Sequence, residues 1–191
     1  LAGDFVTGGQ DTVGVRVPDH PVALGLLEAF ARAGGKGVAA PSANRFGNVS
    51  PTTAQAVADE LSDYLGDADQ ILDGGPCEVG VESTIIDCTG NAPRILRPGA
   101  VTVEMIEDST GLIVGDSASV SGGSVDEVTI RVSGSLDSHY APVATVVLDQ
   151  SPVAGQGFIA MADVATPDGV VRLAAPRTHE EFARVLYAAL R

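Results

Sequence analysis

Residues 71–102 read ILDGGPCEVGVESTIIDCTGNAPRILRPGAVT and hold three short apolar runs, each followed by a turn rich in glycine, proline or hydroxyl side chains. The runs cover residues 71–72, 84–86 and 94–96. Short apolar runs bounded by such turns are typical of buried strands. A similar run occupies residues 38–40, and the valines that alternate over residues 13–17 predict another strand. Because segments with helical spacing separate these runs, the sequence predicts an α/β fold.

Two segments before residue 70 carry the apolar spacing of amphipathic helices. In the first, Asp19 is the expected N-cap of a helix that Pro21 begins and that ends at Gly34. In the second, Ser50 is the expected N-cap of a helix that runs to Gly66. Strands and helices therefore alternate over the first hundred residues.

Composition divides the chain into three parts. Residues 1–107 alternate the expected strands and helices, whereas residues 108–141 are rich in Gly, Ser and Asp, which is typical of a linker. Residues 142–191 resume the α/β pattern, with strand-like runs at 143–148 and 157–161. We expect one α/β domain, a linker and part of a second α/β domain.

Two later threonines are expected to cap helices. Thr102 precedes a short helix, and Thr178 forms a capping box with Glu181 ahead of the final apolar periodicity. The first residues, 1–4, contain neither an initiator Met nor a signal segment, so we expect the chain to begin inside a longer product.

The formal net charge of −14 is concentrated in the middle of the chain. Residues 51–107 carry eleven acidic and two basic side chains, a net charge of −9. Strong binding to a nucleic-acid backbone needs a basic stripe that neutralises phosphates, and the sequence contains none. It also contains no run of 18 apolar residues that would predict a membrane span.

Cysteine and histidine spacing argues against a metal or disulfide framework. Cys77 and Cys88 form no CxxC pair; they read as reduced thiols of a cytoplasmic protein, and a disulfide between them is the alternative that the sequence leaves open. His20, His139 and His179 are scattered, so a zinc site is not expected.

Two arginines stand in unusual positions. Arg16 lies within an alternating apolar run, where a buried guanidinium requires an anionic partner. That partner is either a nearby carboxylate, Asp11 or Asp19, or the carboxylate of a ligand held by a bidentate clamp. Arg97 ends an apolar run before a Pro-Gly turn, a position suited either to reaching a phosphate or to an ordinary surface site.

Two loops carry the remaining candidate groups. Residues 40–51, APSANRFGNVSP, place Ser, Asn and Gly where a helix is expected to begin, and exposed N–H groups there favour an anion. They contain neither GxGxxG nor a Walker lysine, so either capping or a less familiar ligand loop explains them. In residues 80–84, GVEST, Ser83 suits a pocket rim, and no GxSxG supports a serine hydrolase. Glu82 is either a base, a metal-facing carboxylate, or a solvated or salt-bridged side chain.

Taken in chain order, these stretches resemble the YrdC-like family, and specifically its longer, two-domain L-threonylcarbamoyladenylate synthases. The matching stretches are VGVRVPDHP (13–21), APSANRFGNVSPTTA (40–54), ILDGGPCEVGVESTIID (71–87), PRILRPGAVT (93–102) and SHYAP (138–142). Their combination is far more specific than any one of them, and the resemblance covers nearly the whole chain.

The resemblance implies a twisted open mixed α/β sheet around a concave pocket, followed by a linker and a small Rossmann-like domain. Residues 1–107 would be the C-terminal part of the catalytic domain, and residues 142–191 part of the Rossmann-like domain. L-threonine, bicarbonate and ATP, with Mg²⁺, would give threonylcarbamoyl-adenylate and pyrophosphate. A threonylcarbamoyl-transferase complex would then modify the adenosine beside the anticodon of certain tRNAs.

The resemblance also assigns roles to individual residues. Arg16 would hold the threonine carboxylate, Ser83 would contact the same amino acid, and Ser42 would lie where the two substrates meet. The residues assigned to ATP are Thr12, Ala40, Asn44, Ser50, Arg97, His139 and Tyr140. No residue is assigned as a covalent nucleophile or an acid–base group.

Three readings of the function remain at this point. In the family, an upstream Thr-Glu-rich strand and a Lys-x-Arg pair face the substrates, and because neither occurs here we expect little or no turnover by this chain alone. The alternatives to the enzyme are an RNA-binding or translation-associated module without catalysis, and a carbamoyl-adenylate-forming domain of a larger maturation enzyme. The charge of −14 disfavours the first alternative, and SHYAP disfavours the second.

Overall fold

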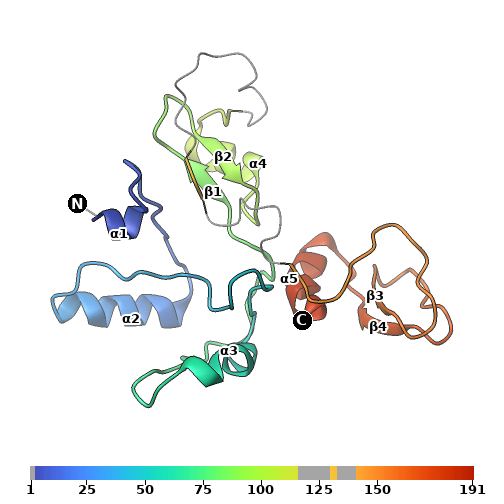
Figure 1. Ribbon diagram of the computed structural model, residues 1–191. Helices are drawn as coiled ribbons and strands as arrows, with labels where there is room; N and C mark the ends of the chain where they lie inside the picture. Colours follow the sequence, from blue (N-terminus) through green and yellow to red (C-terminus); the bar gives the residue numbers. More distant parts are fainter. Residues whose placement is uncertain (1–2, 116–129, 133–140) are drawn as a thin grey trace.

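The computed structural model describes residues 3–115, 130–132 and 141–191. Its elements are α1 (Asp4–Thr7), α2 (Pro21–Arg32), α3 (Ala54–Leu61), the 3₁₀ helix η1 (Ser62–Tyr64), β1 (Ile85–Asp87), β2 (Arg94–Arg97), α4 (Val103–Thr110), β3 (Gly157–Ile159), β4 (Val171–Ala174) and α5 (His179–Leu190). In Figure 1 the elements form separate arms around a central junction, with α4 beside β1 and β2 in one arm and α5 beside β3 and β4 in another.

The described residues contain two small sheets. Strands β1 and β2 pair antiparallel, with Ile86 opposite Ile95 and Asp87 opposite Arg94. Strands β3 and β4 pair parallel, and α5 follows them. The α/β class is therefore confirmed, but among the described residues the strands form two pairs rather than one open mixed sheet.

Four predicted strands are not formed in the described part of the chain. The segments 13–17, 38–40, 71–72 and 143–148 have no ladder partner there. Val15 and Val17 are 78% and 90% exposed, so their alternation has no apolar layer to pack against. A strand needs a hydrogen-bonded neighbouring strand as well as an alternating apolar sequence, and the alternating sequence alone does not provide that neighbour.

Two predicted N-caps are wrong by one to three residues. The imidazole Nδ1 of His20, rather than Asp19, accepts the Val22 N–H at 3.3 Å and caps α2. Helix α3 begins at Ala54 with Thr53 as its cap, because Ser50 donates its hydroxyl elsewhere. The other two predicted caps, Thr102 and Thr178, are confirmed at the starts of α4 and α5.

Polar side chains make up much of the described interior. Among the described residues, Val49 and Ile106 are the buried hydrophobic side chains of the core, and Thr52, Asp87 and Arg97 are also buried. The predicted boundary at residue 107 falls inside α4. None of the described helices has the length and apolar composition needed to cross a bilayer.

Candidate functional site

A cavity of about 200 Å³ is lined by residues that lie far apart in the chain. Its polar side-chain lining comes from three separate parts of the chain. It consists of Arg16, Ser42, Ser50, Thr52, Glu82 and Ser83, besides Cys77. Pockets for drug-sized ligands start at about 300 Å³, so this cavity is suited to a smaller molecule.

Among the described side chains that line this cavity, Arg16 is the one cation and Glu82 the one anion. No ion pair joins Arg16 to Asp11 or Asp19 in the described part of the chain. The intramolecular explanation for this arginine is therefore not supported. A guanidinium facing a small cavity is suited to a ligand carboxylate, which it can bind through two parallel hydrogen bonds.

Glu82 connects the walls of the cavity. Its Oε1 accepts the Ser50 hydroxyl at 2.8 Å, and its Oε2 lies 3.4 Å from Nη2 of Arg97. Arg97 also donates from Nε and Nη2 to the Ser83 carbonyl oxygen, at 3.0 and 2.8 Å, and from Nη2 to Ser83 Oγ at 3.1 Å. Arg97 thus neutralises Glu82 and fixes Ser83, so the salt-bridged interpretation of Glu82 is confirmed.

The turn over residues 44–48 is held from α3 by Glu60. The Glu60 Oε1 accepts the Arg45 N–H and the Asn48 side-chain amide, both at 2.8 Å, and its Oε2 accepts Arg191 Nη2 at 2.6 Å. Burial opposes ionisation of Glu60, but these hydrogen bonds and the charge of Arg191 outweigh it and lower the pKa of the carboxyl. The turn that precedes Ser50 is therefore built on a charged carboxylate.

Asn44 and Gly99 complete the support of the walls. Asn44 donates from Nδ2 to the carbonyl oxygens of Arg45 and Asn48, both at 2.9 Å, and its Oδ1 lies 3.5 Å from Ser50 Oγ. Gly99 approaches the backbone of residues 82–84 so closely that a β-carbon there would overlap it. The Pro-Gly turn after β2 therefore presses directly on the segment that carries Ser83.

The structure brings together most of the predicted site residues. Arg16, Ser42, Ser50 and Ser83 line the cavity, and Arg97 and Asn44 contact those lining residues from behind. Thr12 and Ala40 do not line it. His139 and Tyr140 lie outside the described residues. The sequence predicts that hydroxyls and two arginines from separate strand ends gather around one cavity; Arg16 and the serines line it, whereas Arg97 contacts the lining residue Ser83 and does not itself line the cavity.

Two contributors were missed by the sequence reasoning. Glu60 reads as a helix-surface acid, and nothing local in the sequence signals its bonds to residues 45, 48 and 191. Tyr187 lines the cavity from α5, more than a hundred residues after Ser83. Its place on a helix gives no signal, in the local sequence, of the loop that it meets.

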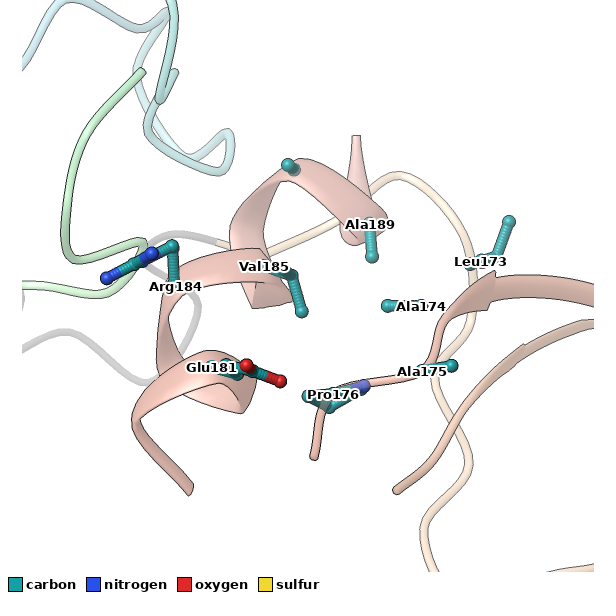
Figure 2. A pocket seen from close by; sticks show the side chains of 9 residues that line it. Leu173, Ala174, Ala175, Pro176, Glu181, Arg184, Val185 and Ala189 are labelled. Atoms are coloured by element: carbon teal, nitrogen blue, oxygen red, sulfur yellow. The ribbon is translucent and has the colours of Figure 1, made fainter. Parts of the chain in front are cut away.

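A wider hollow of about 530 Å³ lies between β4 and α5. Figure 2 shows Ala174, Pro176, Val185 and Ala189 around it, together with Glu181. The carboxylate of Glu181 accepts the N–H of Arg177 at 2.6 Å and so serves the helix start. With its polar groups engaged in this way, the hollow offers less ligand chemistry than the cavity beside Arg16.

Comparison with known sequences gives a family match over half of the chain. Residues 2–99 match the family described as "Telomere recombination", Sua5_yciO_yrdC. The chain is 46% identical over 147 residues to the threonylcarbamoyl-AMP synthase of Pyrococcus abyssi and 43% identical over 144 residues to that of Bacillus subtilis. These matches cover 77% and 75% of this chain but 40% and 38% of the relatives, so the chain spans less than half of their length.

A solved structure gives the corresponding likeness in three dimensions. The structure of P. abyssi Sua5 complexed with L-threonine is similar to 99% of this chain, with a TM-score of 0.72 and 35% sequence identity. The match covers 57% of that chain.

Proposed function

Because the chain belongs to the Sua5/YciO/YrdC family, we propose that it takes part in forming threonylcarbamoyl-AMP from L-threonine, bicarbonate and ATP for tRNA modification. The observation that carries the proposal is the meeting of Arg16, Ser42 and Ser83 around one small cavity. The names of the curated relatives and the threonine-bound neighbour support the same reaction.

In this proposal the amino acid occupies the cavity. The guanidinium of Arg16 pairs with the α-carboxylate, and the hydroxyls of Ser42 and Ser83 offer hydrogen bonds to the remaining polar groups. Ser83 is fixed by Arg97, so it is oriented before the ligand arrives. Such preorganisation lowers the entropic cost of binding.

ATP is proposed to lie beside this cavity, toward the loop over residues 40–51. The residues assigned to the nucleotide are Thr12, Ala40, Asn44, Ser50 and Arg97; of these, Ser50 lines the cavity, and Asn44 and Arg97 contact its lining residues. His139 and Tyr140 would close over it. The described residues contain no group of three or more potential metal ligands, and Glu82 is already engaged, so Mg²⁺ finds no dedicated protein site there.

The proposed chemistry needs positioning more than reactive side chains. The threonine amine attacks bicarbonate and water leaves, giving a carbamate. A carbamate oxygen then attacks the α-phosphorus of ATP, and the bond to pyrophosphate breaks. Both reactants are anions, so the protein must hold them in line and screen their charges. Arg16 supplies that screening on the amino-acid side.

The proposal also covers the second α/β unit, the turnover of this chain and its location in the cell. The parallel pair of β3 and β4 followed by α5 supports part of a Rossmann-like unit over residues 142–191. Turnover by these residues alone is expected to be low, since Lys36 is the one lysine and begins no Lys-x-Arg pair. The free thiols Cys77 and Cys88 support a cytoplasmic location.

Calorimetric binding of L-threonine tests the proposal without requiring turnover. We expect Arg16→Lys to weaken threonine binding by about tenfold or more, because lysine cannot form the paired hydrogen bonds of the guanidinium. Arg32→Lys is the matched control, since Arg32 forms an exposed pair with Glu28 away from the cavity. Equal threonine affinity in the two variants, or no threonine binding by the unmodified chain, contradicts the proposal.

A further inference from the structure

Helix α5 contacts the loop that carries Ser83 through its backbone. The N–H of Gly80 donates to the Ala183 carbonyl at 3.1 Å, and the N–H of Tyr187 donates to the Gly80 carbonyl at 3.3 Å. Nε of Arg184 donates to the Glu78 carbonyl at 3.0 Å. In Figure 2 the Arg184 side chain points away from Val185 and the hollow, toward this loop.

This contact depends on the absence of a side chain at position 80. Gly80 is buried, and a β-carbon built on it would overlap the carbonyl oxygen of Arg184. The helix therefore lies closer to the loop than any residue other than glycine allows. Two hydrogen bonds and this close approach fix the position of one turn of α5.

A second contact fixes the following turn. The guanidinium of Arg191 donates to the Val49 carbonyl at 2.6 Å and to the Ala56 carbonyl at 3.2 Å, and it pairs with Glu60 at 2.6 Å. One end of α5 is thus bound to both loops that form the cavity. Tyr187 lies between these two contacts and lines the cavity.

The chemistry of the cavity assigns Tyr187 a place relative to the ligand. Arg16 is the group for a carboxylate, and the serines are the groups for polar atoms. Among the described residues Tyr187 is the one aromatic side chain of the lining, and the lining valines Val79 and Val81 flank the Gly80 that it contacts. An amino acid whose carboxylate lies on Arg16 has its apolar side-chain atoms left for this wall.

We propose, on the basis of the proposed function, that Tyr187 is a specificity-determining residue for the amino-acid substrate. With Val79 and Val81 it forms the wall that receives the side-chain methyl group of threonine. The second α/β unit of the chain therefore contributes directly to substrate choice, through α5, and does not only cover the first unit.

Calorimetric titration of the chain with L-threonine and with L-serine tests this inference, because the two differ by one methyl group. A methylene group in a hydrophobic pocket is commonly worth about tenfold or more in discrimination. We expect Tyr187→Ala to reduce threonine affinity by about tenfold and serine affinity by less than about threefold. Tyr187→Phe, which keeps the ring, is expected to stay within about twofold for both.

Tyr64→Ala is the matched control, since Tyr64 is 67% exposed and does not line the cavity. If Tyr187→Ala keeps the threonine preference of the unmodified chain, the inference is wrong while the proposed function stands. If the unmodified chain binds neither amino acid, both are wrong. Should circular dichroism show that Tyr187→Ala does not fold, Tyr187→Gln, which places a polar group at this wall, decides the matter, and an unchanged preference there overturns the inference.

Discussion

We expect Arg97→Met to lower the free energy of unfolding by about 3 kcal/mol. The side chains of Arg97 and Glu82 are 10% and 19% exposed, so solvent screens their pair only weakly. Removing one partner of a buried pair costs about 3–5 kcal/mol, because the other charge stays buried. The 3.4 Å separation and the second contact of Glu82, with Ser50, favour the lower end of that range.

Urea unfolding followed by far-ultraviolet circular dichroism measures this change. For an m-value of about 2 kcal/mol per molar urea, a loss of about 3 kcal/mol lowers the midpoint by roughly 1.5 M. Arg32→Met is the control: its pair with Glu28 is 68% exposed on both sides, so we expect a loss below about 0.5 kcal/mol.

A double variant separates the charge effect from lost packing. Glu82→Gln combined with Arg97→Met removes the unpaired carboxylate, and we expect it to be more stable than Arg97→Met alone by about 1 kcal/mol or more. The reasoning is refuted if Arg97→Met and Arg32→Met unfold at the same urea concentration, or if the double variant is no more stable than the single one.

Two further predictions concern the pH dependence of stability at Asp87 and the close approach of α5 to Gly80. Hydrogen bonds from Thr89, followed by the ion pair with Arg94, lower the pKa of Asp87 from 3.8. The ionised carboxylate therefore stabilises the fold at pH values above the pKa of Asp87 in the unfolded chain. This stabilisation is lost as the pH falls through the lower pKa of Asp87 in the folded chain. Urea midpoints measured from about pH 3 to 6 should therefore fall less steeply at the acid end in Asp87→Asn. Gly80→Ala should release α5, raising amide hydrogen exchange there, because its methyl overlaps Arg184. Gly90→Ala, whose methyl lies 3.8 Å from its nearest neighbour, should leave that exchange unchanged.

Local signals in the sequence were sufficient where the partners lie close along the chain. Thr102 and Thr178 cap α4 and α5 because the N–H groups that they accept are three residues away. Ser50 shows the opposite case: it has the chemistry of an N-cap, yet its hydroxyl binds Glu82 thirty-two residues later, and α3 starts at Ala54 instead. The Ser50 hydroxyl therefore donates to a charged carboxylate that the fold brings close, and it does not cap the helix.

The same distinction explains the strands and the site. The alternating valines over residues 13–17 predict a strand face but not a partner, and no partner lies among the described residues. For the site, residue chemistry identified Arg16 and Ser83, since a guanidinium in an apolar run and a hydroxyl beside a strand are locally unusual, and the family resemblance added Ser42. Tyr187 could not be found this way, because its position on a helix face gives no information on the loop that it meets.

In the proposed function, the charges around the cavity would assign the amino acid and the nucleotide to different groups. Arg97 is committed to Glu82 and Ser83, which leaves Arg16 as the lining cation with no ion-pair partner among the described residues. One guanidinium in about 200 Å³ balances a single carboxylate, whereas a triphosphate brings several negative charges and a larger volume. The cavity therefore suits the amino acid alone, and phosphates must find their donors outside it. Reversing the charge of Arg16 would thus abolish amino-acid binding, while a charge change at Arg97 would act first through the position of Ser83.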